Sequence, residues 1–148
     1  MKLSNETKQL IRKEYEEFKE SMYAGKSLVE RQKLDQFFTP PEISIRLIEE
    51  LSDLSGNILD PTCGSGNLLA AALIAGADSD KVFGNDYDQV MVEECRNRLN
   101  KLCARLGKPY IKDWQIHRGD ATDPKSFEFG PDYKYTEYKP VDLFSSFF

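Results

Sequence analysis

Apolar residues near the N-terminus recur at the spacing of one helical face. The positions, separated alternately by four and three residues with charges between them, are Ile11, Tyr15, Phe18 and Met22. This spacing predicts an amphipathic helix over residues 6–23, with Gly25 as its stop. A polar, charged link is then expected as far as Gln36. The apolar face is most simply explained by packing on the rest of the domain or on a partner.

A second helix is predicted after a pair of prolines. Thr39 is followed three residues later by Glu42, which is a capping-box pattern, and Pro40 and Pro41 suit a first helical turn. Apolar residues continue the helical pattern through Leu51, so the helix is expected to end near Gly56.

Strands and helices then alternate. Two more helices are predicted, one that ends near Gly76 and a longer one that ends at Gly107. The short apolar segments between and around these helices predict strands at residues 57–60, 81–86 and 114–119 and a fourth at 141–146. Residues 121–140 have the composition of a loop. This alternation indicates an α/β fold made of right-handed βαβ units, with a parallel sheet covered by helices on both faces.

Composition narrows the class of protein. A chain of 148 residues, 40% of them hydrophobic, fits one domain with a packed core. It contains no apolar segment long enough to span a membrane and no signal peptide at its N-terminus, so a cytoplasmic protein is expected.

Metal and disulfide chemistry are not expected. Three cysteines cannot pair completely, no CxxC motif occurs, and His117 is the only histidine. Cys95 and Cys103 fall on one apolar helical face and are expected to pack in the core. The net charge of -5 argues against tight, independent binding of DNA, which depends on Lys and Arg contacts with phosphates.

Candidate ligand-binding residues all follow predicted strands. Asp60 and the glycine turn that ends at Gly66 follow the first strand, Asp86 ends the second, and Asp120 follows the third. Because ligands of such sheets bind beyond the carboxyl ends of the strands, these groups are expected to form one pocket. Each also has a purely structural explanation, as a tight connection, a surface acid or a turn cap.

The ligand is expected to be a cationic nucleoside. The dinucleotide pattern GxGxxG fails after Gly66, and no GxxxxGK[ST] phosphate loop occurs. An acid such as Asp60 beside the turn suits S-adenosylmethionine, which carries an ammonium and a sulfonium, better than a pyrophosphate. Asp86, twenty residues after Gly66, stands where acids accept hydrogen bonds from ribose hydroxyls.

Four motifs in this order resemble those of the DNA adenine-N6 methyltransferases, best known in the modification subunits of type I restriction systems. The motifs are Gln36-Phe37-Phe38-Thr39-Pro40-Pro41, Asp60-Pro61-Thr62-Cys63-Gly64-Ser65-Gly66, Gly84-Asn85-Asp86-Tyr87-Asp88 and Gly119-Asp120-Ala121. The resemblance implies a Rossmann-like class I fold that depends on S-adenosylmethionine.

The same resemblance implies a role for each matching residue. The segment 37–40 would line the methionine end of the cofactor, and Asp60 with the turn 64–66 would hold its amino acid part. Asp86 would bind the ribose, Tyr87 would lie against the adenine, and Asp120 would accept from the adenine amine. The cofactor-binding residues implied are Phe37, Thr39, Pro40, Asp60, Pro61, Cys63, Gly64, Gly66, Asp86, Tyr87, Asp120 and Ala121.

The family's catalytic motif, an Asn or Asp followed by two prolines and an aromatic residue, is expected at Phe147 but does not occur there. We therefore predict a helical segment (1–35) and a cofactor domain (36–148), truncated before that motif, with no catalytic residue of its own. DNA contact would come from missing downstream regions or a partner subunit. Alternatives are a non-catalytic regulatory subunit, or a methyltransferase for RNA or protein.

Overall fold

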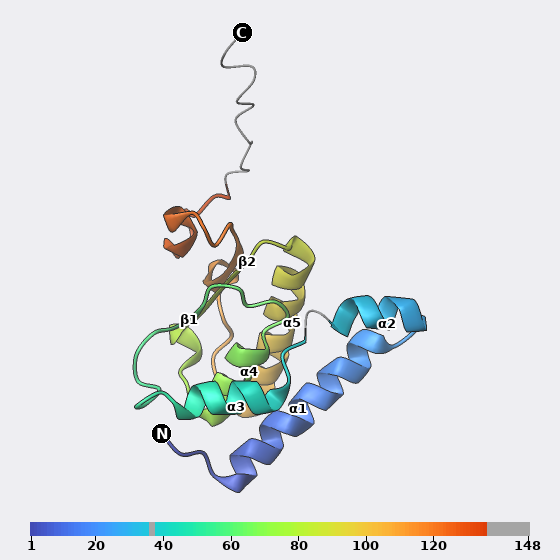
Figure 1. The fold of residues 1–148 in the computed structure, drawn as a ribbon. Coiled ribbons are helices and arrows are strands. Elements are labelled where there is room, and N and C mark those ends of the chain that lie inside the picture. Colours follow the sequence, from blue (N-terminus) through green and yellow to red (C-terminus); the bar gives the residue numbers. More distant parts are fainter. Residues whose placement is uncertain (36–37, 136–148) are drawn as a thin grey trace.

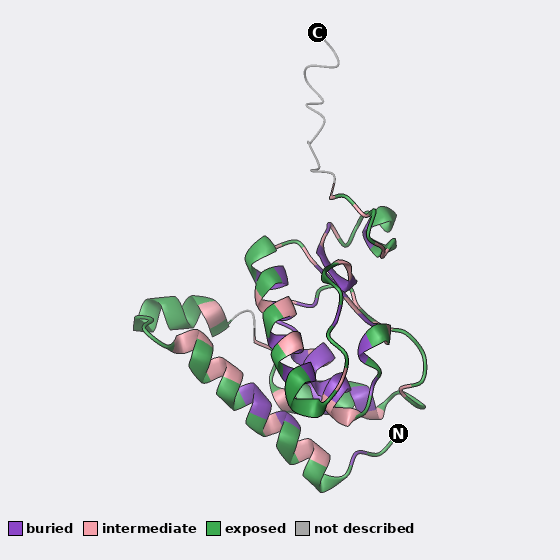
Figure 2. Ribbon diagram, turned by 180° about the vertical axis from the view of Figure 1, so that it is seen from behind, coloured by how far each residue is buried: buried purple, intermediate pink, exposed green. Residues whose placement is uncertain are grey.

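The computed structural model describes residues 1–35 and 38–135 (Figure 1). The chain begins with helix α1 (Asn5–Tyr23), as the apolar spacing predicts. The Ser4 side chain caps it by accepting a hydrogen bond from the Thr7 N–H. Ile11 and Tyr15 are among its buried residues, and the buried part of α1 is coloured purple in Figure 2.

The link expected after α1 is instead a second helix, α2 (Leu28–Asp35). The Ser27 side chain caps its start: the Oγ accepts from the Glu30 N–H and donates to the Glu30 carboxylate, each at 3.2 Å. The prediction of a link was wrong because this short helix buries no residue, so no apolar periodicity reveals it.

Helix α3 (Pro41–Glu49) ends earlier than the sequence predicts. Residues beyond it form a turn in which the Asp53 carboxylate accepts hydrogen bonds from the N–H and the hydroxyl of Ser55. Such local side-chain bonds offer the backbone an alternative to the helix.

Three parallel strands form a sheet in the order β1-β2-β3. They are β1 (Ile58–Asp60), β2 (Val82–Asp86) and β3 (Ile116–Arg118), joined by α4 (Asn67–Ala75) and α5 (Gln89–Leu106). All three strands lie where the sequence predicts them, and β3 is shorter than expected because a 3₁₀ turn (Asp113–Gln115) precedes it. The predicted fourth strand lies outside the described residues.

Helices α4 and α5 pack against each other and on the sheet, while α1 and α3 pack on α4. The expectation of helices on both faces is wrong for the described part of the chain. Both right-handed crossovers advance one strand in the same direction, which places their helices on one face. The opposite face is covered by rings, with Phe83 packed against Trp114 and Phe129.

Buried helix α4 forms the centre of the core, where Leu69 and Leu73 are fully buried. Glycines in the left-handed conformation bound it, Gly66 at φ 94° and Gly76 at φ 118°. A Cβ atom on Gly66 would also lie 2.8 Å from the Cys95 Sγ of α5, so only glycine lets the turn approach that helix.

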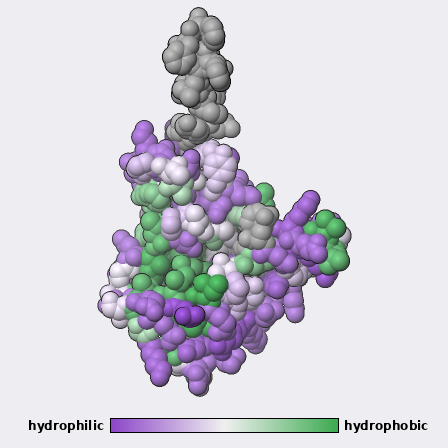
Figure 3. Space-filling model, in the orientation of Figure 1, coloured by the Kyte–Doolittle hydropathy of each residue, from purple (hydrophilic) through white to green (hydrophobic). Residues whose placement is uncertain are grey.

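Strand β1 is an edge of the described sheet, and apolar surface gathers between it and α3 (Figure 3). Leu47 and Leu59 are half exposed there and line a groove of about 480 Å³.

No helix in the described residues is long and apolar enough to cross a membrane. Likewise, the described residues contain no cluster of three His, Cys, Asp or Glu side chains placed to hold a metal ion.

Candidate functional site

The carboxyl ends of the three strands are tied together by Asn85. Its side-chain Nδ2 donates to the main-chain carbonyl oxygens of Pro61 and Gly119, each at 3.1 Å. The main-chain carbonyl oxygen of Asn85 accepts a hydrogen bond from the Cys63 N–H at 2.9 Å. The N–H of Gly119 also donates to the Asp86 carbonyl at 3.0 Å. The segments that follow β1 and β3 are therefore fixed to the end of β2.

A cavity of about 230 Å³ opens at these strand ends. It brings together five of the residues predicted to bind the cofactor, from three segments distant in sequence. The residues that line it are Thr39, Asp60, Thr62, Cys63, Gly64, Asn67, Leu68 and Asp86. Two of them are carboxylates and none is a cation, so the lining favours a positively charged ligand.

Asp86 connects β2 to the glycine turn. Its Oδ2 accepts a hydrogen bond from the Gly64 N–H at 2.8 Å, and its Oδ1 accepts from the Asp88 N–H at 2.9 Å. Asp88 in turn caps α5 by accepting from the N–H groups of Val90 and Met91. The carboxylate is thus held in one orientation at the cavity wall.

Asp60 is half-buried at the end of β1, and its carboxylate accepts from the Thr62 N–H at 3.1 Å. Burial raises the pKa of Asp60, and the charge of Asp86 raises it further, while the bond from Thr62 opposes them. Two neighbouring acids without a lining cation are stabilised together by a cationic ligand.

Cys63 lines the cavity and packs against the sheet. Its side chain is buried, and a hydrogen bond with the Cys95 thiol together with burial raises its pKa, so it remains a neutral thiol. A Cβ on Gly84 would lie 3.0 Å from both the Cβ and the Sγ of Cys63. Cys63 is therefore a packing group between the turn and the sheet.

Thr39 lines the cavity but does not cap α3. The prediction of a capping box was wrong: the helix starts one residue later, Pro40 occupies the N-cap position, and no side chain caps it. Glu42, the other half of the expected box, instead forms an ion pair with Arg12 of α1. Phe37 lies outside the described residues.

Asp120 lines a second cavity, of about 580 Å³, rather than the first. Its Oδ1 accepts from the N–H and the hydroxyl of Thr122, and these bonds lower the pKa of Asp120. Tyr87 is exposed, with its ring edge-on to Tyr135. Neither cavity is lined by the remaining predicted residues, which are Pro40, Pro61, Gly66, Tyr87 and Ala121.

His117 has a packing environment. Its ring lies between those of Phe129 and Tyr133, with centroids at 4.2 and 3.6 Å, and its Nε2 lies 2.6 Å from the Ser126 carbonyl oxygen. Burial lowers the pKa of His117, which favours the neutral ring.

Two asparagines were missed by sequence reasoning. Asn67, the first residue of α4, lines the cavity, and Asn85 joins the strand ends. Asn85 stands in a motif already recognised, between Gly84 and Asp86, and an amide at an expected buried strand position is a signal for a hydrogen-bonded structural role.

A model of the N-6 DNA methylase family matches residues 8–127. The chain belongs to this family. The match includes α1 as well as the strands and the glycine turn, and it confirms the resemblance seen in the four motifs. The chain is accordingly an S-adenosylmethionine-dependent methyltransferase-like domain.

Relatives of this chain include two Type II methyltransferases. One is M.VspI of Vibrio sp. (strain 343), 36% identical over 93 residues, which are 60% of this chain and 21% of the relative. Another is M.NspV of Nostoc sp., 32% identical over 96 residues, 58% of this chain and 20% of the relative.

A tRNA (guanine(10)-N2)-dimethyltransferase of Methanothermobacter thermautotrophicus is 36% identical over 92 residues, 59% of this chain and 24% of the relative. The matched part thus spans a fifth to a quarter of the length of these proteins. As methyltransferases, they imply S-adenosylmethionine as the methyl donor.

Proposed function

We propose that the cavity at the strand ends binds S-adenosylmethionine in a Rossmann-like class I fold. The observation that carries the proposal is the pairing of Asp60 with Asp86 around the Gly64–Gly66 turn, in a cavity without a lining cation. The ammonium and sulfonium of this cofactor match that charge, whereas the phosphates of a dinucleotide do not.

The proposed contacts follow the residues of the site. Asp60 and the turn hold the amino acid part, with the segment 37–40 beside it, and Asp86 accepts from the ribose hydroxyls. Tyr87 and Asp120 recognise the adenine. When bound, the cofactor supplies an electrophilic methyl group, and the chain's own residues hold it in place.

We propose the exocyclic amine of adenine in DNA as the methyl acceptor, within a restriction-modification system. The family and the two Type II relatives support this substrate. The tRNA-modifying relative supports RNA as a second candidate.

With a net charge of -5, the domain offers little to hold phosphates, so we propose that another region or a partner subunit binds the nucleic acid. In this arrangement residues 1–35 are a helical segment and 36–148 carry the cofactor.

Titration calorimetry tests cofactor binding. We expect heat of binding from S-adenosylmethionine and S-adenosylhomocysteine and none from NAD. Tighter binding of NAD than of either methionine compound would contradict the proposal. Transfer of tritium from labelled cofactor to DNA or to tRNA, with the chain alone and with any partner that co-purifies, then distinguishes the substrates.

A further inference from the structure

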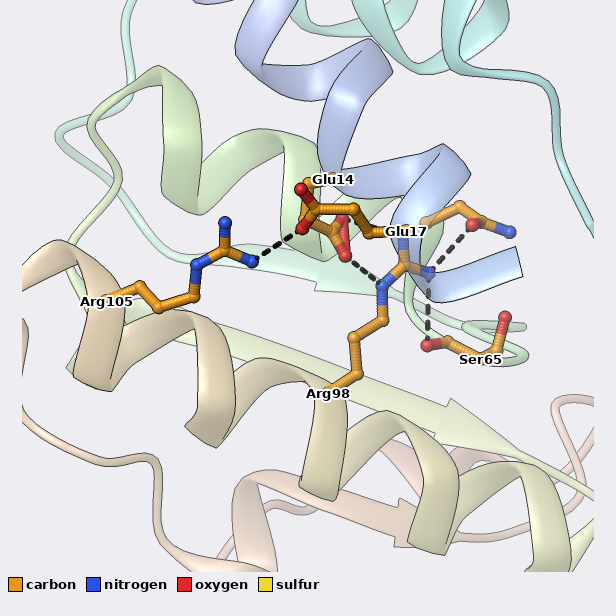
Figure 4. Close-up of polar contacts among 6 residues, drawn as sticks. Glu14, Glu17, Ser65, Arg98 and Arg105 are labelled. Atoms are coloured by element: carbon orange, nitrogen blue, oxygen red, sulfur yellow. Dashed lines mark hydrogen bonds and ion pairs between the residues drawn. The ribbon is translucent and has the colours of Figure 1, made fainter. Parts of the chain in front are cut away.

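A buried ion pair joins the N-terminal helix to the rest of the site. Glu14 of α1 accepts two hydrogen bonds from Arg98 of α5, from Nε at 2.7 Å and from Nη2 at 2.8 Å (Figure 4). The side chains are only 10% and 3% exposed, and the Phe18 ring lies 4.1 Å from the guanidinium carbon. Such bidentate geometry fixes the plane of the guanidinium.

The remaining nitrogen of that guanidinium faces the glycine turn. Arg98 Nη1 donates to the Asn67 Oδ1 at 2.8 Å and reaches the Ser65 carbonyl oxygen at 3.4 Å. Ser65 is the middle residue of the turn 64–66, and Asn67 lines the cavity. Glu14 therefore reaches the cavity wall through one intermediate side chain.

Helix α1 also contacts a second segment of the cavity lining, the one that holds Thr39. The Phe38 ring packs edge-on against Tyr15, Phe18 and Tyr23, with centroids 5.8–6.3 Å apart. Phe38 directly precedes Thr39, which lines the cavity. Two segments that line the cavity are thus linked to one helix.

We propose that Arg98, oriented by Glu14, is a positioning residue that sets the geometry of the glycine turn. This inference rests on the proposed binding of the cofactor. A buried ion pair is often matched in stability by apolar side chains of similar volume, because desolvation of the charges offsets their attraction. Apolar side chains cannot, however, supply the N–H group with which Arg98 donates hydrogen bonds to Ser65 and Asn67.

The same two helices provide a matched control. Arg105 of α5 pairs with Glu17 of α1 at 2.9 Å, but these side chains are about half exposed and do not contact the turn (Figure 4). Replacing this pair tests the α1–α5 interface without touching the cavity.

The experiment compares the double variant Glu14→Leu/Arg98→Met with Glu17→Leu/Arg105→Met in three measurements. Urea unfolding reports stability, amide hydrogen exchange of residues 61–70 reports the order of the turn, and calorimetry gives the affinity for S-adenosylmethionine. We expect the first variant to keep its unfolding midpoint, to exchange about tenfold faster in the turn and to bind about tenfold more weakly. The control should match the wild type in all three.

Wild-type exchange in the turn of Glu14→Leu/Arg98→Met would overturn the proposal, as would equal effects in the control. If the wild-type chain does not bind S-adenosylmethionine, the proposed function fails, and the exchange measurement still decides the positioning role. The single variant Arg98→Lys keeps a positive charge beside Glu14 but loses the planar fork that donates to both Glu14 and the turn, and it covers the case in which the double variant does not fold. Faster exchange limited to the turn is expected there too, and its absence would count against the proposal.

Discussion

The Asp86 carboxylate accepts a hydrogen bond from the main-chain N–H of Gly64, with 2.8 Å between Oδ2 and the nitrogen. The acid that ends β2 thereby fixes the turn that follows β1, twenty-two residues earlier in the chain. In the proposed complex the same carboxylate faces the ribose, so one side chain both shapes the cavity and contacts the ligand.

Asp86→Asn should weaken the binding of S-adenosylmethionine roughly ten- to hundredfold, because hydrogen bonds to a charged acceptor are worth about 1.5–3 kcal/mol. Calorimetry measures the change. The matched variant Asp80→Asn, on the exposed turn before β2, should bind as the wild type does. Equal affinity of Asp86→Asn and the wild type would place the ribose elsewhere.

The affinity for the cofactor should fall in mild acid because of Asp60. Burial raises the pKa of this carboxyl above its usual 3.8, so on lowering the pH it takes up a proton before an exposed aspartate does. The neutral acid no longer attracts a cation, and binding that is complete above the raised pKa is lost as the pH passes below it. Calorimetry from about pH 7 to about pH 4.5 follows the loss. Asp60→Asn should bind weakly with a flatter dependence; a wild-type profile in that variant would assign the titration to another group.

Gly66→Ala should destabilise the domain more than Gly76→Ala. Both glycines have positive φ, which costs an alanine about 1–3 kcal/mol, but only at Gly66 does the added Cβ meet Cys95. Urea unfolding of both variants isolates the contribution of the clash. The extra cost should shrink in the background of Cys95→Ala, as a double-mutant cycle would detect. Equal costs at the two glycines would mean that the turn can move away from α5.

Asn85→Asp should lower the free energy of unfolding by about 2–5 kcal/mol. The amide group that donates to two carbonyl oxygens would be replaced by a carboxylate oxygen, which cannot donate and is repelled by them. The repulsion raises the pKa of the new carboxyl in the folded state. Its protonation at low pH therefore restores part of the lost stability. Chemical unfolding at neutral and acid pH measures this recovery. The exposed control Asn57→Asp should change stability by no more than about 0.5 kcal/mol.

Features set by neighbouring residues could be predicted from the sequence. The three strands, the glycine turn and the positions of Asp60, Asp86 and Asp120 at or just after the strand ends depend on spacings of a few residues, and the structure agrees with them. Even so, local patterns can mislead. The box at Thr39 does not form, while a side-chain cap at Ser27 starts a helix that no apolar pattern reveals.

Long-range pairs could not be predicted in this way. Glu14 lies three residues after Ile11 and four before Phe18, at the edge of the apolar face of α1, but nothing near it in the sequence indicates which residue pairs with it. Only the fold shows that it meets Arg98 and is buried. The helices on a single face have a similar origin, because the strand order, which the alternation of elements leaves open, decides which face each crossover covers.

The ion pair between Glu14 and Arg98 also has a consequence for biosynthesis. Its partners are 84 residues apart, and at a synthesis rate of about 5–20 residues per second Arg98 is made roughly 4–17 s after Glu14. During this interval α1 has left the peptidyl-transferase centre, but α5, which neutralises its acid and covers Phe18, does not yet exist. The helices α3 and α4, on which α1 packs, are made before α5, so α1 can dock on them while Glu14 still lacks its partner. The charge of Glu14 is neutralised only when the second crossover is complete.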